Sequence, residues 1–428
     1  MKLLIFAHVP PPHHGQSYMV QLMLHGFGGD HRKRRKNFVP RHPAGDVHGL
    51  KCYHINNRLS QGLEDIGEFR GGKLILLLAH CLEAIWCRFR YGVTHLYYIP
   101  APGKKSALYR DWMVMFLCRP FFKTMTLHWH AAGLASWLET AVQMRTRSLT
   151  YWGAKHADLS IVLSRYNLAD AQKLLPQRVR VVSNGISDPC PDFGEAVLPR
   201  RRQRFALRVR LLKGEKVDAA ELARAGDPQV VRVLYLAHCM REKGLFDAML
   251  GVQIANRTLG TRNSAVRLKL VAAGAFVSEE EKREFDQLMA DRELAAMVEP
   301  LGFVSGPTKH QTFRDADLFC FPTYYLGENQ PVNIIEAFAY GLPLVTTHWR
   351  SLPEMLPQGY PGLVPIKSPR QVAEAMLHLL AIESGESLRT IFLERFTLEK
   401  HLAALAEAIR SVEQPAPKLA LGRAAQPS

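Results

Sequence analysis

Short apolar runs alternate with longer amphipathic stretches along this chain, and that alternation restricts its fold more than any other feature. Apolar runs separated by helical patterns are typical of a parallel sheet with helices on both faces. In the first half, the expected strands are 2–8, 52–56, 94–99, 123–128, 158–163 and 178–182. In the second half, they are 230–237, 266–272, 298–303, 317–321, 344–347 and 362–364. The sequence therefore predicts an α/β protein with two Rossmann-like domains of similar size.

The stretches between the expected strands have the apolar spacing of helices. The clearest are 17–27, 72–90, 106–118, 165–174, 279–291, 331–340 and 398–412. With 428 residues, 47% of them hydrophobic, the chain has material for more than one core. We expect a first domain over 1–186, a second over 228–397, a closing helix over 398–413 and a disordered tail over 414–428.

A basic segment over 187–227 separates the two expected domains. It contains prolines and a cluster of six arginines: Arg200, Arg201, Arg202, Arg204, Arg208 and Arg210. A charge run of this kind is typical of a solvated linker or insertion. An arm that binds an anion or faces a membrane is the alternative.

The cysteine pattern and the apolar segments indicate a cytoplasmic protein. Seven cysteines include no C-x-x-C pair of the kind that zinc or redox sites use, so we expect free thiols in a reducing compartment. The apolar start of the chain ends at prolines without a small-residue cleavage site, which favours a strand over a signal peptide. The lipophilic segment 73–89 is interrupted by His80, Glu83 and Arg88, so we do not expect it to span a membrane.

A formal net charge of +16 favours contact with polyanions. The sequence has no zinc-finger, RNP-like or repeat pattern, so we expect no nucleic-acid partner. A peripheral position on the inner face of a membrane, beside a lipid-linked acceptor, is the favoured explanation, and a charge without a specific partner is the alternative. Segment 110–123 mixes aromatic, aliphatic and basic residues as interfacial helices do, but a buried helix with snorkelling ends fits it equally well.

The segment GENQPVNIIEAFAYGLPLVTT, from Gly327, carries the strongest chemical pattern. Glu328 and Glu336 are separated by seven residues, and Pro331 stands where a helix begins, so its missing N–H costs nothing. The start of a helix after a strand is an anion site, because free N–H groups and the positive end of the dipole face outward together. We therefore expect a diphosphate above four successive residues: Gln330, Pro331, Val332 and Asn333. The alternative is that Glu328 caps a helix and Glu336 lies at the surface.

This segment resembles the E-x7-E signature of retaining GT-B glycosyltransferases of family GT4, in the variant that reads E-x-Q-P before the helix. The resemblance implies two Rossmann-like domains that face a cleft. It also implies that Glu336 binds the nucleotide ribose and that Glu328 contacts the donor sugar near the reacting carbon.

The segment LYLAHCMREKGLFDAML, from Leu234, is similar to the family segment in which an arginine and a lysine hold the donor phosphates. Lys243 matches the lysine, whereas His238 stands at the position of the arginine. Arg241 is a second candidate for that role, and a solvated helix-start lysine is the alternative for Lys243.

Two first-domain segments complete the resemblance. PPPHHGQSYMV, from Pro10, is similar to the family loop after the first strand, where Gly15 would let the backbone approach a ligand. TLHWHAAGL, from Thr126, places His128 and His130 at a strand end, and His128 matches a histidine that lies beside the donor sugar in many members. A plain turn at Gly15 and a core histidine at His128 are the alternatives.

The resemblance covers most of the chain and implies transfer of a sugar from a nucleotide-diphosphate donor to a glycan or lipid-linked acceptor. It implies retention of anomeric configuration, no metal and no other cofactor. Two other classes stay open: a nucleotide-sugar epimerase or phosphorylase on the same fold, and a non-catalytic membrane-associated scaffold.

Overall fold

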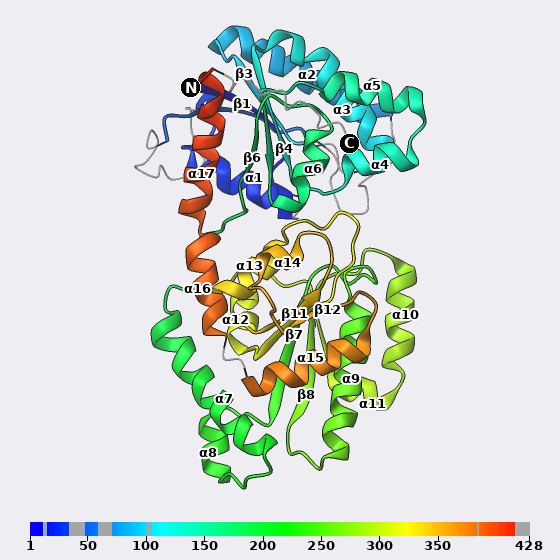
Figure 1. Ribbon diagram of the computed structural model, residues 1–428, viewed down its shortest axis with the longest axis vertical. Helices are drawn as coiled ribbons and strands as arrows, with labels where there is room; N and C mark the ends of the chain where they lie inside the picture. The colour runs from blue at the N-terminus through cyan, green and yellow to red at the C-terminus, as the bar shows by residue number, and fades with distance from the viewer. Residues whose placement is uncertain are drawn as a thin grey trace, which may run out of the picture.

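The computed structural model describes residues 1–11, 15–33, 48–58, 71–100, 103, 105–382 and 385–415. Two α/β domains follow one another along the long axis of the molecule, and a final helix runs back from the second domain to the first (Figure 1). Each domain contains one parallel six-stranded sheet with helices around it. The predicted pair of Rossmann-like domains is therefore confirmed.

The first sheet has the strand order β2-β1-β3-β4-β5-β6. Its strands are β1 (Lys2–Phe6), β2 (Lys51–Ile55), β3 (His95–Tyr98), β4 (Thr124–Trp129), β5 (Leu159–Val162) and β6 (Val179–Val181). Its main helices are α1 (Gly15–Gly26), α2 (Gly71–Tyr91), α3 (Lys105–Leu117), α4 (Leu134–Ala141), α5 (Met144–Ala154) and α6 (Leu168–Gln172). The sequence pattern did not predict α4 and α5. Helix α5 buries only Thr150 and Gly153, so it has no apolar stripe to detect.

The pleat of the first sheet sends alternate side chains to two separate apolar clusters. Leu4 and Phe6 face the cluster that holds α2 and α3. Leu3 and Ile5 face the cluster formed with α1 and α17 (Leu398–Arg410). Because Leu405 lies in that second cluster, the last described helix packs against the first domain (Figure 1).

The second sheet has the order β12-β11-β10-β7-β8-β9. Its strands are β7 (Val230–Leu236), β8 (Arg267–Ala273), β9 (Val298–Gly302), β10 (Leu318–Phe321), β11 (Leu344–Thr347) and β12 (Leu363–Val364). Its helices are α9 (Leu245–Thr261), α10 (Glu279–Met289), α11 (Arg292–Met297), α12 (Gly306–Asp315), α13 (Val332–Ala339), α14 (Leu352–Met355), α15 (Pro369–Ile382) and α16 (Glu386–Arg395). The strand order reverses between β7 and β10, and ligands of such sheets bind beyond the carboxyl ends of the strands at that point.

The basic segment is helical and packs on the second domain. It forms a π-helical turn (Phe193–Val197), α7 (Leu198–Leu212) and α8 (Ala219–Arg224). The expectation of a solvated charge run is wrong for Arg201, Arg204 and Arg208, which are buried. The pattern misled because an arginine-rich helix looks solvated unless the buried acid that pairs with it is known.

That buried acid is Asp317, at the start of β10. Arg204 donates two hydrogen bonds to its carboxylate, both 2.9 Å long, and Arg208 lies 3.3 Å from it. Burial alone would raise the pKa of Asp317, but the two guanidinium groups outweigh burial and lower it to about 2. The cluster thus fastens α7 to the second sheet.

Three further expectations concern the chain ends, the cysteines and the membrane. The expected tail falls outside the described residues from 416 onward, and Arg178 donates a 2.6 Å hydrogen bond to the carbonyl of Gln414 just before it. All seven cysteines are buried free thiols. Among the described helices, none has the length and apolar character to cross a bilayer.

We predict that Asp317→Ala destabilises the second domain by about 3–5 kcal/mol, because it leaves two buried arginines without a counter-ion. The contribution of the carboxylate is present above its unfolded pKa, near 4, and is lost as the pH falls toward about 2. Thermal unfolding at neutral pH measures the loss. The matched control is Arg202→Ala, which removes an exposed, solvent-screened pair with Glu386 and should leave the unfolding temperature almost unchanged. Equal shifts for the two variants would contradict the account.

Candidate active site

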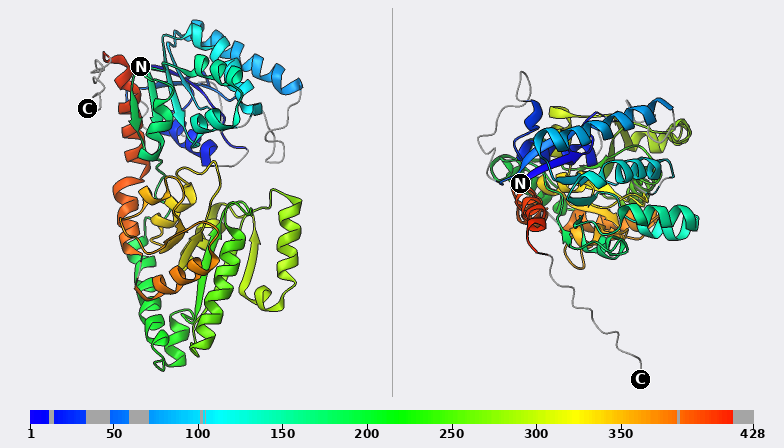
Figure 2. Two further views of the ribbon diagram at one scale, coloured as in Figure 1. Left: turned by 45° about the vertical axis from the view of Figure 1, so that its right-hand side comes forward. Right: turned by 90° about the horizontal axis from the view of Figure 1, so that it is seen from above.

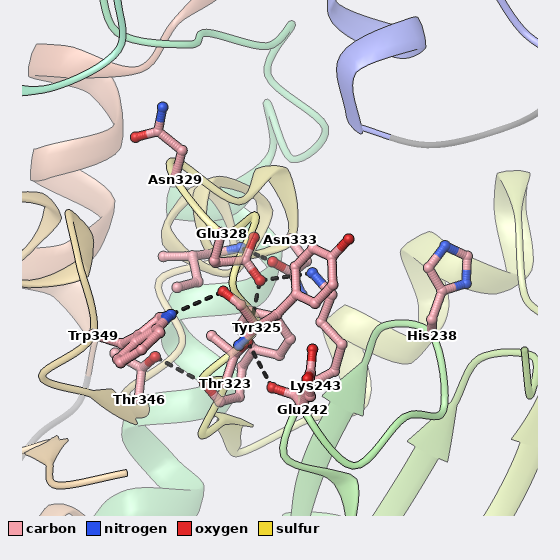
Figure 3. Close-up of polar contacts among 12 residues, drawn as sticks. His238, Glu242, Lys243, Thr323, Tyr325, Glu328, Asn329, Asn333, Thr346 and Trp349 are labelled. Atoms are coloured by element: carbon pink, nitrogen blue, oxygen red, sulfur yellow. Dashed lines mark hydrogen bonds and ion pairs between the residues drawn. The ribbon is translucent and has the colours of Figure 1, made fainter. Parts of the chain in front are cut away.

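The candidate site lies where the sheet order of the second domain reverses. The loop after β7 and the loop after β10 meet there: the backbone N–H of Tyr324 donates to the carbonyl of Glu242, at 2.8 Å. From the start of α13, Asn333 donates to the carbonyl of Leu236 at the end of β7, also at 2.8 Å. The loop after β11 joins through Trp349, whose indole N–H donates to the carbonyl of Tyr325 (Figure 3).

An ion pair between Lys243 and Glu328 stands at the centre of this site. The Nζ of Lys243 lies 2.6 Å from Oε2 of Glu328, and both side chains are largely buried (Figure 3). The hydroxyl of Thr323 lies 3.2 Å from the same carboxylate oxygen. The structure therefore brings together two residues that the sequence singled out 85 positions apart.

Aromatic rings complete the surroundings of Lys243. Its Nζ lies 4.5 Å from the ring centroid of Tyr325 and 5.6 Å from that of Phe321. A lysine ammonium over aromatic faces is stabilised without losing its charge. Sequence reasoning missed Tyr325 and Thr323, because neither residue type signals a site without its neighbours in space.

Helix α13 begins at this site with Pro331 as its N-cap and Val332 as its first residue. Pro331 provides no side-chain cap, and in the first turn Oδ1 of Asn333 accepts a 2.9 Å hydrogen bond from the N–H of Ile334. Gly15, at the start of α1 in the first domain, faces this helix start: a Cβ added to Gly15 would lie 3.7 Å from Cγ2 of Val332. The predicted helix start and Gly15 thus face one another across the two domains.

Glu336 lies one turn into α13 and is buried beside the first domain. Lys309 on α12 forms an ion pair with Glu336, in which its Nζ donates a 2.5 Å hydrogen bond to Oε1 of Glu336. The sequence did not single out Lys309. Burial, and then the charge of Glu336, raise the pKa of Tyr18 on α1. The alternative of a surface Glu336 is therefore excluded, and the carboxylate faces the same interdomain region as Gly15.

His238 and Arg241, the two candidates for the arginine position, differ in where they lie. Burial, together with the charge of Lys243, lowers the pKa of His238, which keeps its ring neutral beside the site. Figure 3 shows His238 to one side of Lys243. Arg241 instead pairs with Glu284 on α10 and stacks 4.8 Å from the ring centroid of Phe246. The guanidinium of Arg241 is thus already paired with a carboxylate on α10.

Gln330 has a different place from the one expected. Its Oε1 accepts a 2.5 Å hydrogen bond from the backbone N–H of Asn184, and its Nε2 donates to the carbonyl of Leu163 at 3.3 Å. Both partners belong to the first domain. The side chain of Gln330 thus joins the domains and does not face the loop of Lys243.

His128 is fully buried on β4. Its Nδ1 is hydrogen-bonded to the hydroxyl of Tyr97, and its Nε2 has no partner among the described residues. Burial first, and then His130 and His401, lower the pKa of His128 well below its ordinary value. His130 lies next to it, with ring centroids 4.2 Å apart. The structure therefore shows a neutral imidazole in the first domain, without a described contact to Glu328.

The described part of the chain contains no group of three or more His, Cys, Asp or Glu side chains arranged to hold a metal ion. The charges at the site come instead from Lys243, Lys309 and the start of α13, and the carboxylates from Glu328 and Glu336. Such a site is suited to an anionic ligand with polar hydroxyl groups on both sides of its charged part.

Comparison with known proteins gives a family match within the second domain. Residues 224–390 match the family described as Glycosyl transferases group 1. The amylovoran biosynthesis glycosyltransferase AmsK of Erwinia amylovora is 26% identical over 164 residues, which are 37% of this chain and 37% of that protein. The chain thus matches little more than a third of the length of AmsK.

Two solved structures share the fold over nearly the whole chain. Sucrose-phosphate synthase from Thermosynechococcus elongatus has a TM-score of 0.64 at 16% identity, over 96% of this chain and 99% of that one. HepE from Anabaena, in complex with UDP, has a TM-score of 0.60 at 15% identity, over 96% and 100% of the two chains.

Fold and site together define a protein with the two-domain GT-B fold, whose charged site lies at the carboxyl edge of its second sheet. Within that second domain, the part of the chain over residues 224–390 is similar to the glycosyl transferases group 1 family.

We predict that Gly244→Ala disturbs this site. Gly244 follows Lys243 with a φ of +86°, and an added Cβ would lie 2.4 Å from the carbonyl oxygen of Pro322. We expect the variant to lose about 1–3 kcal/mol of stability in thermal unfolding, because both the conformation and the contact are unfavourable. The control is Gly260→Ala on α9, where nothing lies within 4 Å of the new Cβ. That change should leave stability unchanged or raise it by about 0.5–1 kcal/mol. A tolerated Gly244→Ala would show that the loop is not held as described.

Proposed function

We propose that the protein transfers a sugar from a nucleoside-diphosphate sugar to a lipid-linked or polysaccharide-precursor acceptor. We further propose that transfer retains the anomeric configuration and needs no metal. The observation that carries this proposal is the pairing of Lys243 with Glu328 beside the start of α13. A cation, an uncapped helix start and a carboxylate then lie around one position where a sugar diphosphate fits.

The donor is proposed to lie along the start of α13. Its diphosphate would contact Lys243 and the backbone at Pro331, Val332 and Asn333, because those groups supply the positive field. Glu336 would accept hydrogen bonds from the ribose, and Glu328 would contact the transferred sugar. HepE, solved with UDP, supports a nucleoside-diphosphate ligand on this fold.

Three residues have roles that follow from their places around this donor. Gly15 would let the first domain approach the donor, since Val332 is the one described residue within 4 Å of an added Cβ. His238 is favoured over Arg241 as the substitute for the family arginine, because Arg241 is held by Glu284. We propose that His128, a buried histidine whose Nε2 has no partner among the described residues, lies beside the donor sugar.

The reaction breaks the bond between the anomeric carbon and the phosphate oxygen and forms a bond between that carbon and an acceptor hydroxyl oxygen, whose proton passes to the leaving diphosphate. Positive charge grows on the sugar while negative charge grows on the leaving diphosphate. Preorganised cations and N–H groups stabilise that negative charge. Lys243 and the start of α13 are proposed to do this without a metal ion. Activity that disappears in EDTA and returns only with a divalent cation would contradict that part of the proposal.

The acceptor and the location are proposed from the chain's charge and its relative. The name of AmsK places that protein in amylovoran biosynthesis, which supports a glycan precursor as acceptor. The net charge of +16 favours a phosphorylated, membrane-borne acceptor, so we propose that the enzyme works in the cytoplasm on the inner face of a membrane.

We predict that Lys243→Met lowers the affinity for UDP and the rate of sugar transfer, each by about 10- to 100-fold, since a charge-assisted contact with the diphosphate is lost. Calorimetry and a transfer assay with labelled nucleotide sugars measure the two effects. Lys282→Met, which removes an exposed pair with Asp286, is the matched control and should leave both unchanged. Unaltered transfer in folded Lys243→Met would refute the assignment.

We predict that Glu328→Gln separates nucleotide binding from transfer. The carboxylate competes with a diphosphate for the Lys243 ammonium, so its removal should tighten UDP binding by about two- to tenfold. Transfer should nevertheless fall by at least about 100-fold, because Glu328 is proposed to act at the sugar. The same calorimetry and transfer assay test both parts. Weaker UDP binding together with normal transfer would reverse the two proposed roles.

A further inference from the structure

Helix α2 is apolar on two opposite sides. Its inner side, with Leu77, Cys81 and Ala84, is buried in the core of the first domain. Its outer side carries a stripe of exposed apolar residues, hereafter the outer stripe: Ile75, Leu78, Leu82, Trp86 and Phe89. The spacing of three and four residues puts all of them on one face of the helix. Between 41% and 73% of each of these residues is exposed, although a helix that is apolar all round is normally covered on every side.

The outer stripe continues onto the neighbouring elements. Phe89 lies 6.0 Å, between ring centroids, from Phe121 in the short helix Arg119–Phe121. A cavity of about 620 Å³ follows, with Phe116 and Trp152 in its lining, and 71% of Trp152 is exposed. Helix α3 contacts both α2 and α5, and its Phe116 lies 5.1 Å, between ring centroids, from Trp152. The outer stripe, Phe121 and Trp152 thus lie on neighbouring elements and are together called the apolar face. Figures 1 and 2 show α2 at the end of the first domain that is farthest from the second.

Cationic side chains lie on the elements that carry this apolar face, namely the end of α2, the short helix after α3, the residue before β4, and α5 with the residue after it: Arg88, Arg90, Arg119, Lys123, Arg145 and Lys155. Arg119, Lys123 and Lys155 line the cavity together with Trp152 and a single acid, Asp158. Arg88 is held in place by a 2.8 Å hydrogen bond from its Nε to the carbonyl of Phe121. The arrangement thus places positive charge around an apolar centre.

We propose that this apolar face docks on the surface of an anionic lipid bilayer. Trp86 and Phe89 enter the boundary between headgroups and acyl chains, while the surrounding arginines and lysines contact lipid phosphates. A second copy of the chain fits less well, because a symmetric contact through the same face would bring the two cationic rims together. The inference rests on the membrane part of the proposed function and assigns that contact to α2.

Helix α3 overlaps the first part of segment 110–123, which the sequence singled out for membrane contact, and packs against α2 and α5. Val114 and Met115 are buried, so most of its apolar residues serve the core. The short helix after it contributes Phe121, of which 42% is exposed. The buried-helix interpretation therefore fits α3, and the membrane contact belongs to α2.

Flotation of the full-length protein with lipid vesicles tests the proposal. The wild type should float with vesicles of phosphatidylcholine and phosphatidylglycerol, and less with phosphatidylcholine alone. The double variant Trp86→Glu, Phe89→Glu should lower the partition coefficient of the protein between vesicles and water by about 100-fold, because the loss of each apolar side chain contributes a factor of about ten. Phe303→Glu on the second domain, at a residue that is 64% exposed, is the matched control and should float like the wild type. A double variant that floats normally would overturn the proposal.

A second variant tests the role of charge. Arg90→Gln with Lys123→Gln should reduce the preference for anionic vesicles at low salt, and high salt should reduce that preference in the wild type. Wild-type protein that stays out of both vesicle types would overturn the proposal. A different outcome would also overturn it: the wild type sediments as a dimer and does not float, and the Trp86→Glu, Phe89→Glu variant sediments as a monomer. In that case the apolar face would be a contact between two copies of the chain.

The test is independent of the transfer reaction. UDP calorimetry on the double variant should give the wild-type affinity, which shows that the fold is intact. If the protein floats but transfers no sugar, the proposed function is wrong and the proposed membrane contact is supported. If the protein transfers sugar to a soluble acceptor but does not float, the membrane contact is wrong and the proposed function is supported.

Discussion

The ion pair between Lys243 and Glu328 holds the candidate site together. It joins the loop after β7 to the loop after β10, at the position where the order of the second sheet reverses. A largely buried lysine without a counter-ion would be costly, so Glu328 keeps the ammonium in place when no ligand is bound. A bound diphosphate would bring its own negative charge to the same ammonium. The pair therefore makes the site ready for an anion while it remains stable without one.

The site is built where the two domains meet, and several contacts fix how they meet. Gln330 bonds to the backbone of Asn184 and Leu163, and Glu354 on α14 accepts hydrogen bonds from the N–H groups of Arg165 and Tyr166, at 2.8 and 2.6 Å. Helix α17 runs from the second domain back to the first and packs against it, which gives a further connection between the two domains. The second domain thus supplies the charged groups of the candidate site, and the first domain approaches it at Gly15. HepE and sucrose-phosphate synthase share this two-domain fold.

Much of the fold could be predicted, because buried parallel strands leave apolar runs that are visible in the sequence. The pairing of Lys243 with Glu328 was accessible only through the resemblance, since no local pattern relates residues 85 positions apart. Lys309, Tyr325 and Thr323 were missed because each is ordinary in its own segment and gains meaning only from its neighbours in space. The arginines of α7 were misjudged for the same reason, since burial of Arg204 depends on Asp317, in a distant strand. The exposed side of α2 also needed the structure, because the sequence shows an apolar helix but not which side is covered.

The central claim is that the second domain binds a nucleoside diphosphate through Lys243 and the start of α13. Calorimetric titration of the full-length protein with UDP, GDP, ADP, CMP and TDP tests it most directly. The account predicts saturable heat for at least one diphosphate and a weaker signal for the monophosphate CMP, which has one phosphate fewer for Lys243 and the helix start to hold. A folded protein that gives no heat with any of these nucleotides would contradict it.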